Sequence, residues 1–124
     1  MKLGLMDETN GYSNFDGFYL GIPRLRWIVA RDHLFEVYGS LRPAHKTRTK
    51  WVRLRFERWN GKKWVWVKTV KAYSYSKGSP SNHYGIWTRL DRAGQYRVRA
   101  RHPGDCPHCN GPNTYTAWRR FYVR

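Results

Sequence analysis

Hydrophobic and polar residues alternate strictly in residues 96–101. Tyr96, Val98 and Ala100 occupy every second position, and arginines occupy positions 97, 99 and 101. Successive side chains of a β-strand point to opposite faces, so this pattern predicts a strand with one face on a core and the other in water. Three arginines on one solvent face are more cationic than a sandwich requires. The pattern therefore raises a question of function as well as of fold.

The same alternation predicts further strands between turn signals. In residues 51–59 the hydrophobic side chains are expected to point inward and Arg53, Arg55 and Glu57 outward, and the hairpin signal Asn60-Gly61 follows directly. No segment shows a convincing 3.6-residue period. The expected strands are residues 24–29, 34–41, 51–59, 63–72, 83–90, 96–101 and 116–123. About seven short strands at this spacing predict an all-β sandwich or barrel.

The first part of the chain has a different composition. Residues 1–22 are rich in Gly, Asn and Asp and predict an irregular N-terminal arm, whereas residues 23–124 are expected to form one β-domain. A chain of 124 residues suits a single domain that buries its own core. No apolar run is long enough to span a membrane, and the N-terminus lacks the apolar segment of a signal peptide.

A turn-and-strand motif stands at residues 90–96. Leu90 precedes Tyr96 by six residues, and Gly94 lies in the turn between them. This spacing resembles the tyrosine corner of fibronectin type III and immunoglobulin-like sandwiches, in which the tyrosine hydroxyl bonds to backbone. Leu90 and Tyr96 are therefore expected to form a structural corner.

A wider resemblance covers residues 35–123. The segments VYGSLRP at 37–43, NGKKW at 60–64, GQYRVRA at 94–100 and TAWRRFYV at 116–123 together resemble immunoglobulin-like modules of actinobacterial secreted and surface proteins. Immunoglobulin-like domains that decorate phage virions are similar. The resemblance implies an immunoglobulin-like (fibronectin type III-like) two-sheet antiparallel sandwich. It also implies a non-catalytic structural or adhesive module in an extracellular, cell-surface or virion setting.

The positive charge is expected to concentrate on one sheet face. The chain has 24 Lys and Arg against eight Asp and Glu, a formal charge of +16. In an immunoglobulin-like sandwich the strand 96–101 would lie beside 51–59, and like charges facing each other would destabilise the sheet unless aromatic rings stacked on them. The expected face comprises Arg53, Arg55, Arg97, Arg99, Arg101, Trp51, Trp59 and Trp118.

Two interpretations of this face stay open. It is either a purely structural ladder of cations and rings, or a binding face for a protein or an anionic polymer such as a wall polymer or glycan. Self-assembly within a larger structure is a further option. The alternative function is nucleic-acid binding, since basic and aromatic residues together are typical of single-strand binders. No ribonucleoprotein motif or recognition helix supports it, so such binding is expected to be non-specific.

Two cysteines occur in the segment Cys106-Pro107-His108-Cys109. A local disulfide is the favoured interpretation, and a zinc site that adds His102 and His108 is the alternative, with inert thiols third. No cofactor is therefore expected. The sequence also lacks a Gly-x-Ser-x-Gly elbow, a phosphate-binding glycine loop and a His-Glu-x-x-His helix, so no enzymatic activity is expected.

Overall fold

The computed structural model describes residues 19–45, 51–74, 81–102 and 114–124, which form strands and no helix. Within these residues no helix is long and apolar enough to cross a membrane. The prediction of an all-β protein is thus confirmed. The strands are β1 (Tyr19–Leu20), β2 (Ile28–Val29), β3 (Phe35–His45), β4 (Trp51–Trp59), β5 (Trp64–Ser74), β6 (Ser81–Thr88), β7 (Gly94–His102), β8 (Thr114–Tyr115) and β9 (Arg119–Val123).

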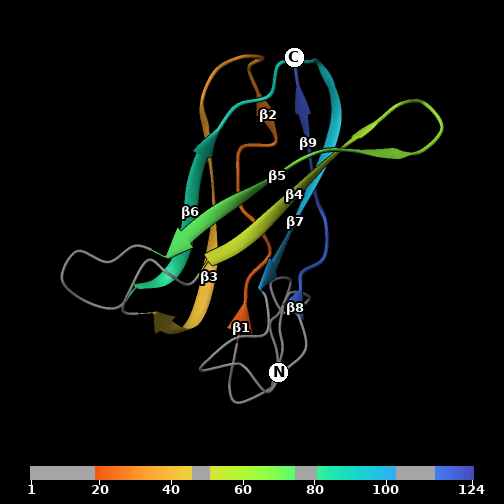
Figure 1. The fold of residues 1–124 in the computed structure, drawn as a ribbon. Coiled ribbons are helices and arrows are strands. Elements are labelled where there is room, and N and C mark those ends of the chain that lie inside the picture. The colour runs from red at the N-terminus through yellow and green to blue at the C-terminus, as the bar shows by residue number, and fades with distance from the viewer. Residues whose placement is uncertain (1–18, 46–50, 75–80, 103–113) are drawn as a thin grey trace.

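The strands follow one hydrogen-bonded path that folds over into two layers (Figure 1). The order along the path is β1-β3-β6-β5-β4-β7-β9-β2, with β8 pairing to β7. The layers meet where β5 and β6 share only two residue pairs, Tyr73 with Gly85 and Ser74 with Tyr84. The predicted two-sheet arrangement is confirmed, but the immunoglobulin-like type is not.

The segment before β3, residues 19–34, connects the two layers on the side opposite the β5–β6 pairing, and we call it the joining segment. Its first part pairs with β3, where the backbone N–H of Arg24 donates to the Tyr38 carbonyl at 2.6 Å. Its last part, β2, runs parallel to β9, and the Tyr122 N–H donates to the Trp27 carbonyl at 2.7 Å. Because the segment changes layer, only Ile28–Val29 of the strand expected at residues 24–29 forms a regular ladder.

Part of the expected N-terminal arm belongs to this segment. Tyr19–Leu20 pairs with β3, and Leu20 and Ile22 are buried. Residues 1–18 lie outside the described residues, so a domain boundary at residue 22 stays a prediction.

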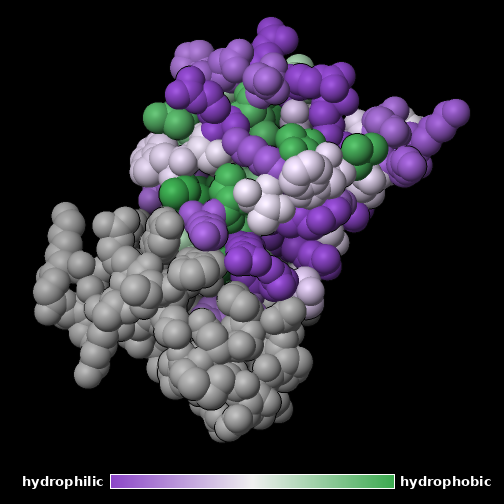
Figure 2. Space-filling view, viewed as in Figure 1, coloured by the Kyte–Doolittle hydropathy of each residue, from purple (hydrophilic) through white to green (hydrophobic). Residues whose placement is uncertain are grey.

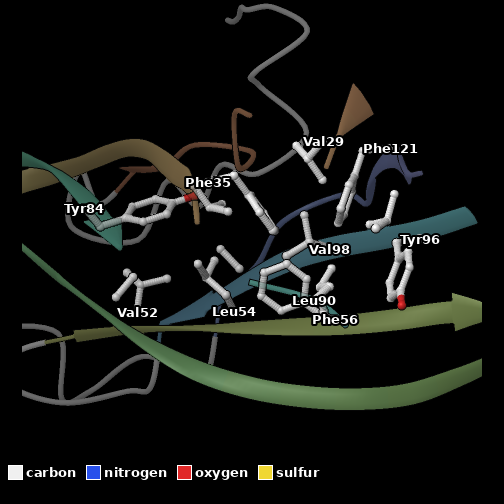
Figure 3. Close-up of a cluster of buried hydrophobic side chains, with 14 of the residues drawn as sticks. Val29, Phe35, Val52, Leu54, Phe56, Tyr84, Leu90, Tyr96, Val98 and Phe121 are labelled. Carbon is white, nitrogen blue, oxygen red and sulfur yellow. The ribbon is translucent and has the colours of Figure 1, made fainter. Parts of the chain in front are cut away.

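The core fills the space between the layers (Figure 3). The inward half of β7 contributes to it as its alternation predicts, because Tyr96, Val98 and Ala100 are almost fully buried. Three phenylalanine rings from β3, β4 and β9 meet there, with centroids 5.9–6.4 Å apart. Each buried large side chain contributes about 1.5–3 kcal/mol of transfer free energy. Besides the three β7 residues, the buried core side chains are Leu20, Val29, Phe35, Val37, Val52, Leu54, Phe56, Ala72, Tyr84, Leu90, Phe121 and Val123.

The Tyr84 ring needs a glycine beside it. A β-carbon on Gly39 would overlap the hydroxyl oxygen and two ring carbons of Tyr84, which real structures do not tolerate. The ring is fixed there because its hydroxyl donates to the Gly21 carbonyl at 2.9 Å. This bond links β6 to the segment that joins the layers.

The β4–β5 hairpin differs from the two-residue turn that Asn60-Gly61 suggests. Four residues, 60–63, separate the strands, and the Asn60 Oδ1 accepts from the backbone N–H groups of Lys62 and Lys63. Further along, Val67 is an extra residue in β5 that creates a β-bulge. Beyond the bulge, Thr69 lies opposite Arg55. The bulge thereby determines which β5 side chains lie opposite the outward side chains of β4.

The turn before β7 is held by backbone-directed bonds. The Tyr96 hydroxyl donates to the Arg92 carbonyl at 2.7 Å, and Leu90 is buried. The Arg58 guanidinium donates to the Ala93 carbonyl from Nε at 3.0 Å and from Nη2 at 2.7 Å. Leu90 and Tyr96 thus lie at a corner between β6 and β7, and Arg58 links that corner to the end of β4.

Candidate functional site: the arginine face

The pairing of β4 with β7 brings the five arginines of interest to one outer face. Arg53 lies opposite Arg101 and Arg55 lies opposite Arg99. Residues directly opposite each other in an antiparallel pair share a face. One row further along, Glu57 lies opposite Arg97. We call the outer side of β4 and β7 that holds Arg53, Arg55, Glu57, Arg97, Arg99 and Arg101 the arginine face.

Neighbouring strands extend this face with more cations. On β5, Lys71 lies opposite Arg53. On β9, Arg120 lies opposite Arg97. The described rows therefore contain seven cationic side chains and a single carboxylate, that of Glu57. Three of these rows place arginine directly against arginine, the third being Arg97 opposite Arg120, which destabilises the sheet unless other groups offset the repulsion.

Glu57 offsets part of the repulsion. Its Oε2 accepts from Arg55 Nε at 2.7 Å, and its Oε1 accepts from Arg97 Nε at 2.9 Å and Nη2 at 2.6 Å. Burial by itself raises the pKa of Glu57, but the hydrogen bonds and charges of the two arginines outweigh it and lower the pKa below its ordinary value. Glu57 was expected to be solvated; it is buried because these arginines cover it.

Aromatic rings offset a further part of the repulsion, around Arg97 and Arg99. The Arg97 Cζ lies 3.9 Å from the centroid of the Trp118 ring and 4.6 Å from that of Trp64. The Arg99 Cζ lies 4.6 Å from the Trp118 centroid and 4.7 Å from that of Tyr115. Such contacts contribute about 0.5–2 kcal/mol each. Trp118 thus contacts both arginines and helps to hold their side chains in place.

The three tryptophans expected on this face lie in different places. Trp118 contacts the arginines, whereas Trp59 lies against Trp64 at the hairpin end, with ring centroids 5.4 Å apart and the ring planes tilted by 60°. The side chain of Trp51 lies outside the described part of the chain. Sequence reasoning missed Trp64 and Tyr115. Trp64 reaches the face across the β4–β5 hairpin, and Tyr115 belongs to a two-residue strand that has no periodicity to detect.

A hollow of about 250 Å³ opens between the arginines. Within the described residues, neither Arg53 nor Arg101 has a carboxylate or aromatic partner, in contrast to Arg55, Arg97 and Arg99. Guanidinium groups without a protein partner can donate two parallel hydrogen bonds to a carboxylate, phosphate or sulfate. The hollow is lined by Arg53, Arg55, Thr69, Arg99, Arg101 and Tyr115.

The cysteine segment cannot be assessed in the same way. Cys106, His108 and Cys109 lie outside the described residues, so the choice between disulfide and zinc stays a prediction. His102 ends β7 and is buried. Across residues 19–45, 51–74, 81–102 and 114–124, no three His, Cys, Asp or Glu side chains are grouped to hold a metal ion.

Comparison with known proteins gives a structural likeness only. No protein-family model matches the chain, and no curated protein sequence matches it. The structure is similar to a variant of superoxide reductase (neelaredoxin) from Ignicoccus hospitalis, with TM-score 0.50 and 14% identity over 95% of this chain and 92% of that one. Another structure of that reductase matches with TM-score 0.47 and 16% identity over 85% and 82% of the two chains, too weak to support an argument.

These matches correct the interpretation based on immunoglobulin-like modules. The similar structures are superoxide reductase domains, so the resemblance to immunoglobulin-like and fibronectin type III-like modules is wrong. The non-catalytic structural or adhesive function and the extracellular, cell-surface or virion location derived from it are wrong on the same finding. The physical reason is that strand alternation and a tyrosine-corner spacing are local features, which folds of different strand order can share.

The expectations of no enzymatic activity and no cofactor are corrected too. The similar structures are those of a reductase, and electron transfer of that kind uses a redox-active centre. At 14% identity the likeness extends to the fold alone, and the described residues of this chain supply no metal ligands as a group.

Proposed function

We propose that this protein binds an anionic polysaccharide, sulfated or phosphorylated, on the arginine face. The observation that supports the proposal is the pair Arg53 and Arg101, which face each other beside a hollow without a partner among the described residues. Two like charges in register cost stability. An anion seated between them would remove that cost on binding.

The surrounding residues favour binding over mere repulsion. Trp118 and Tyr115 hold the neighbouring arginine Arg99 in position before any ligand arrives. A site whose side chains are already ordered loses less conformational entropy on binding. The overall charge of +16 accelerates the approach of an anion and makes it dependent on salt.

A charge-matched pair of variants tests the proposal. The R53Q/R101Q variant removes two positive charges from the hollow, and the R89Q/R92Q variant removes two from exposed positions outside it. Affinity for a heparin-derived oligosaccharide is measured by titration calorimetry at about 150 mM salt. We expect R53Q/R101Q to weaken binding roughly tenfold or more and R89Q/R92Q to change it about twofold or less. Equal losses in both variants would show diffuse surface charge and reject the site.

A competing oligonucleotide identifies the polymer class. Single-stranded DNA of equal charge is added to the complex with the sulfated oligosaccharide. Non-specific DNA binding falls steeply with salt, so weak displacement at about 150 mM is the expected result. If the DNA binds more tightly than the oligosaccharide, and does so through Arg53 and Arg101, the ligand is a nucleic acid and the proposed polymer class is wrong.

A second candidate function is reduction of a small anion, and the fold similarity to superoxide reductase favours it. A strongly cationic protein attracts an anionic substrate such as superoxide. The test is elemental analysis of the purified full chain together with the rate of superoxide loss. A bound redox metal and accelerated loss, both removed in a C106S/C109S variant, would support it. Metal-free protein without acceleration would reject it and leave the anion-binding proposal unaffected.

A further inference from the structure

A second cavity lies between the joining segment and β3 and shares no lining residue with the arginine face. Its volume is about 580 Å³, within the range of about 300–1,000 Å³ that small-molecule sites occupy. It is lined by Leu25, Arg26, Ile28, Val29, Ala30, His33, Leu34, Phe35, Glu36, Tyr38, Trp87 and Arg124.

The cavity follows from the path of the joining segment. The segment leaves β3 after the bridge between Arg24 and Tyr38 and reaches β9 at Ile28. In between, the chain crosses from one layer to the other and leaves β3 uncovered on that side. Val29 and Phe35, both buried, form part of the wall on the core side.

Large apolar side chains around the opening are unusually exposed. Leu34 is 57% and Trp87 60% exposed, and Ile28 and Tyr38 are also exposed. On the face drawn in Figure 2, hydrophobic side chains are visible among polar ones in the upper half, where Figure 1 places β2. Contiguous apolar exposure of this kind marks a binding surface in a stable protein. The flat Trp87 and Tyr38 side chains suit a planar ligand.

The charges at the cavity select the sign of that ligand. Arg26 and Arg124 line it, with Glu36 as the acidic side chain. The His33 Nδ1 lies 3.0 Å from the Arg31 carbonyl oxygen, which is an acceptor, so Nδ1 must carry the hydrogen and donate it. In the neutral ring, Nε2 is then an acceptor. An anionic group on the ligand would meet the arginines.

We infer that this cavity binds a small aromatic acid, with its rings against Leu34, Tyr38 and Trp87 and its acidic group near Arg26 and Arg124. The volume excludes a folded macromolecule and suits one or two fused rings with substituents. This site does not depend on the proposed function of the arginine face.

Two fluorescent probes that differ only in their acid group test the inference. One is 1-anilinonaphthalene-8-sulfonate, and the other is neutral N-phenyl-1-naphthylamine; both emit more strongly in an apolar site. We expect saturable binding of the sulfonate to the folded full chain, roughly tenfold tighter than that of the neutral amine. The R26Q/R124Q variant should reduce sulfonate affinity to that of the amine and leave amine affinity unchanged. The charge-matched R89Q/R92Q variant should alter neither.

An exposed substitution protects the test against loss of folding. The L34D variant places a negative charge at the mouth without removing core volume, so circular dichroism should stay unchanged while sulfonate binding falls at least tenfold. Sulfonate binding that is insensitive to L34D and R26Q/R124Q would overturn the inference. So would loss of the signal in R53Q/R101Q instead, which would locate the probe on the arginine face.

Discussion

Replacing Glu57 with Gln should destabilise the fold by about 2 kcal/mol near pH 7. The carboxylate accepts three hydrogen bonds from Arg55 and Arg97, and bonds to charged groups are worth roughly 1.5–3 kcal/mol each. A glutamine of the same shape retains one acceptor oxygen but turns an NH₂ group toward a guanidinium. The Arg55 side chain is 44% exposed and regains water, so most of the loss comes from Arg97, which is 22% exposed.

The effect should depend on pH in a defined direction. The arginines lower the pKa of Glu57 in the folded state, so its contribution is fully present above its ordinary pKa of about 4.5. The contribution is lost as the pH falls through the lowered value. The difference in stability between the wild type and E57Q should therefore be largest near neutral pH and shrink in acid.

Urea denaturation, monitored by tryptophan fluorescence at pH 7 and at about pH 3, measures the free energy of unfolding of wild type and E57Q and shows how their difference changes with pH. In a separate thermal melt at neutral pH, the melting temperature of E57Q should be lower by roughly 5–10 °C. The D91N variant, which removes an exposed carboxylate away from the arginine face, serves as control and should change stability by less than about 0.5 kcal/mol. If E57Q were as stable as wild type at pH 7, or if its deficit were the same at both pH values, the assigned role of Glu57 would be refuted.

Three further substitutions probe the frame that positions the sites. G39A should cost at least about 2 kcal/mol by urea denaturation because its methyl group overlaps the Tyr84 ring; unchanged stability would show that the ring has room. Y96F should cost about 1 kcal/mol in the same assay, since the bond to the Arg92 carbonyl is lost, and a neutral result would mean that water replaces the hydroxyl. G94A, at a φ of 145°, should lower the melting temperature by several degrees, and an unchanged value would argue against strain there.

Much of the arginine face follows from alternation alone. Once Leu54 and Val98 point inward, Arg55 and Arg99 must point outward, because side chains of a strand alternate. That β4 lies beside β7 came from a comparison with another sandwich type, and the adjacency is present although that family resemblance is wrong.

Other parts of the site could not be predicted, because they depend on tertiary contacts. The bulge at Val67 adjusts the register of β5, and nothing in the local sequence requires an extra residue there. Glu57 was expected to be solvated because the alternation of hydrophobic and polar residues along β4 does not show that the Arg97 side chain would cover the carboxylate. The second cavity depends on where the joining segment changes layer, which no periodicity records.

The parallel pairing of β2 with β9 has a consequence for biosynthesis. Residues 28 and 29 pair with residues 122 and 123, so this ladder forms only when two segments far apart in the sequence are both present. In a nascent chain that still lacks β9, the edge of β7 that pairs with β9 would have no partner strand, and the core would lack the Phe121 side chain. Contacts so distant in sequence form late and slowly. A chain truncated near Arg119 would therefore expose the edge of β7 and be prone to aggregation.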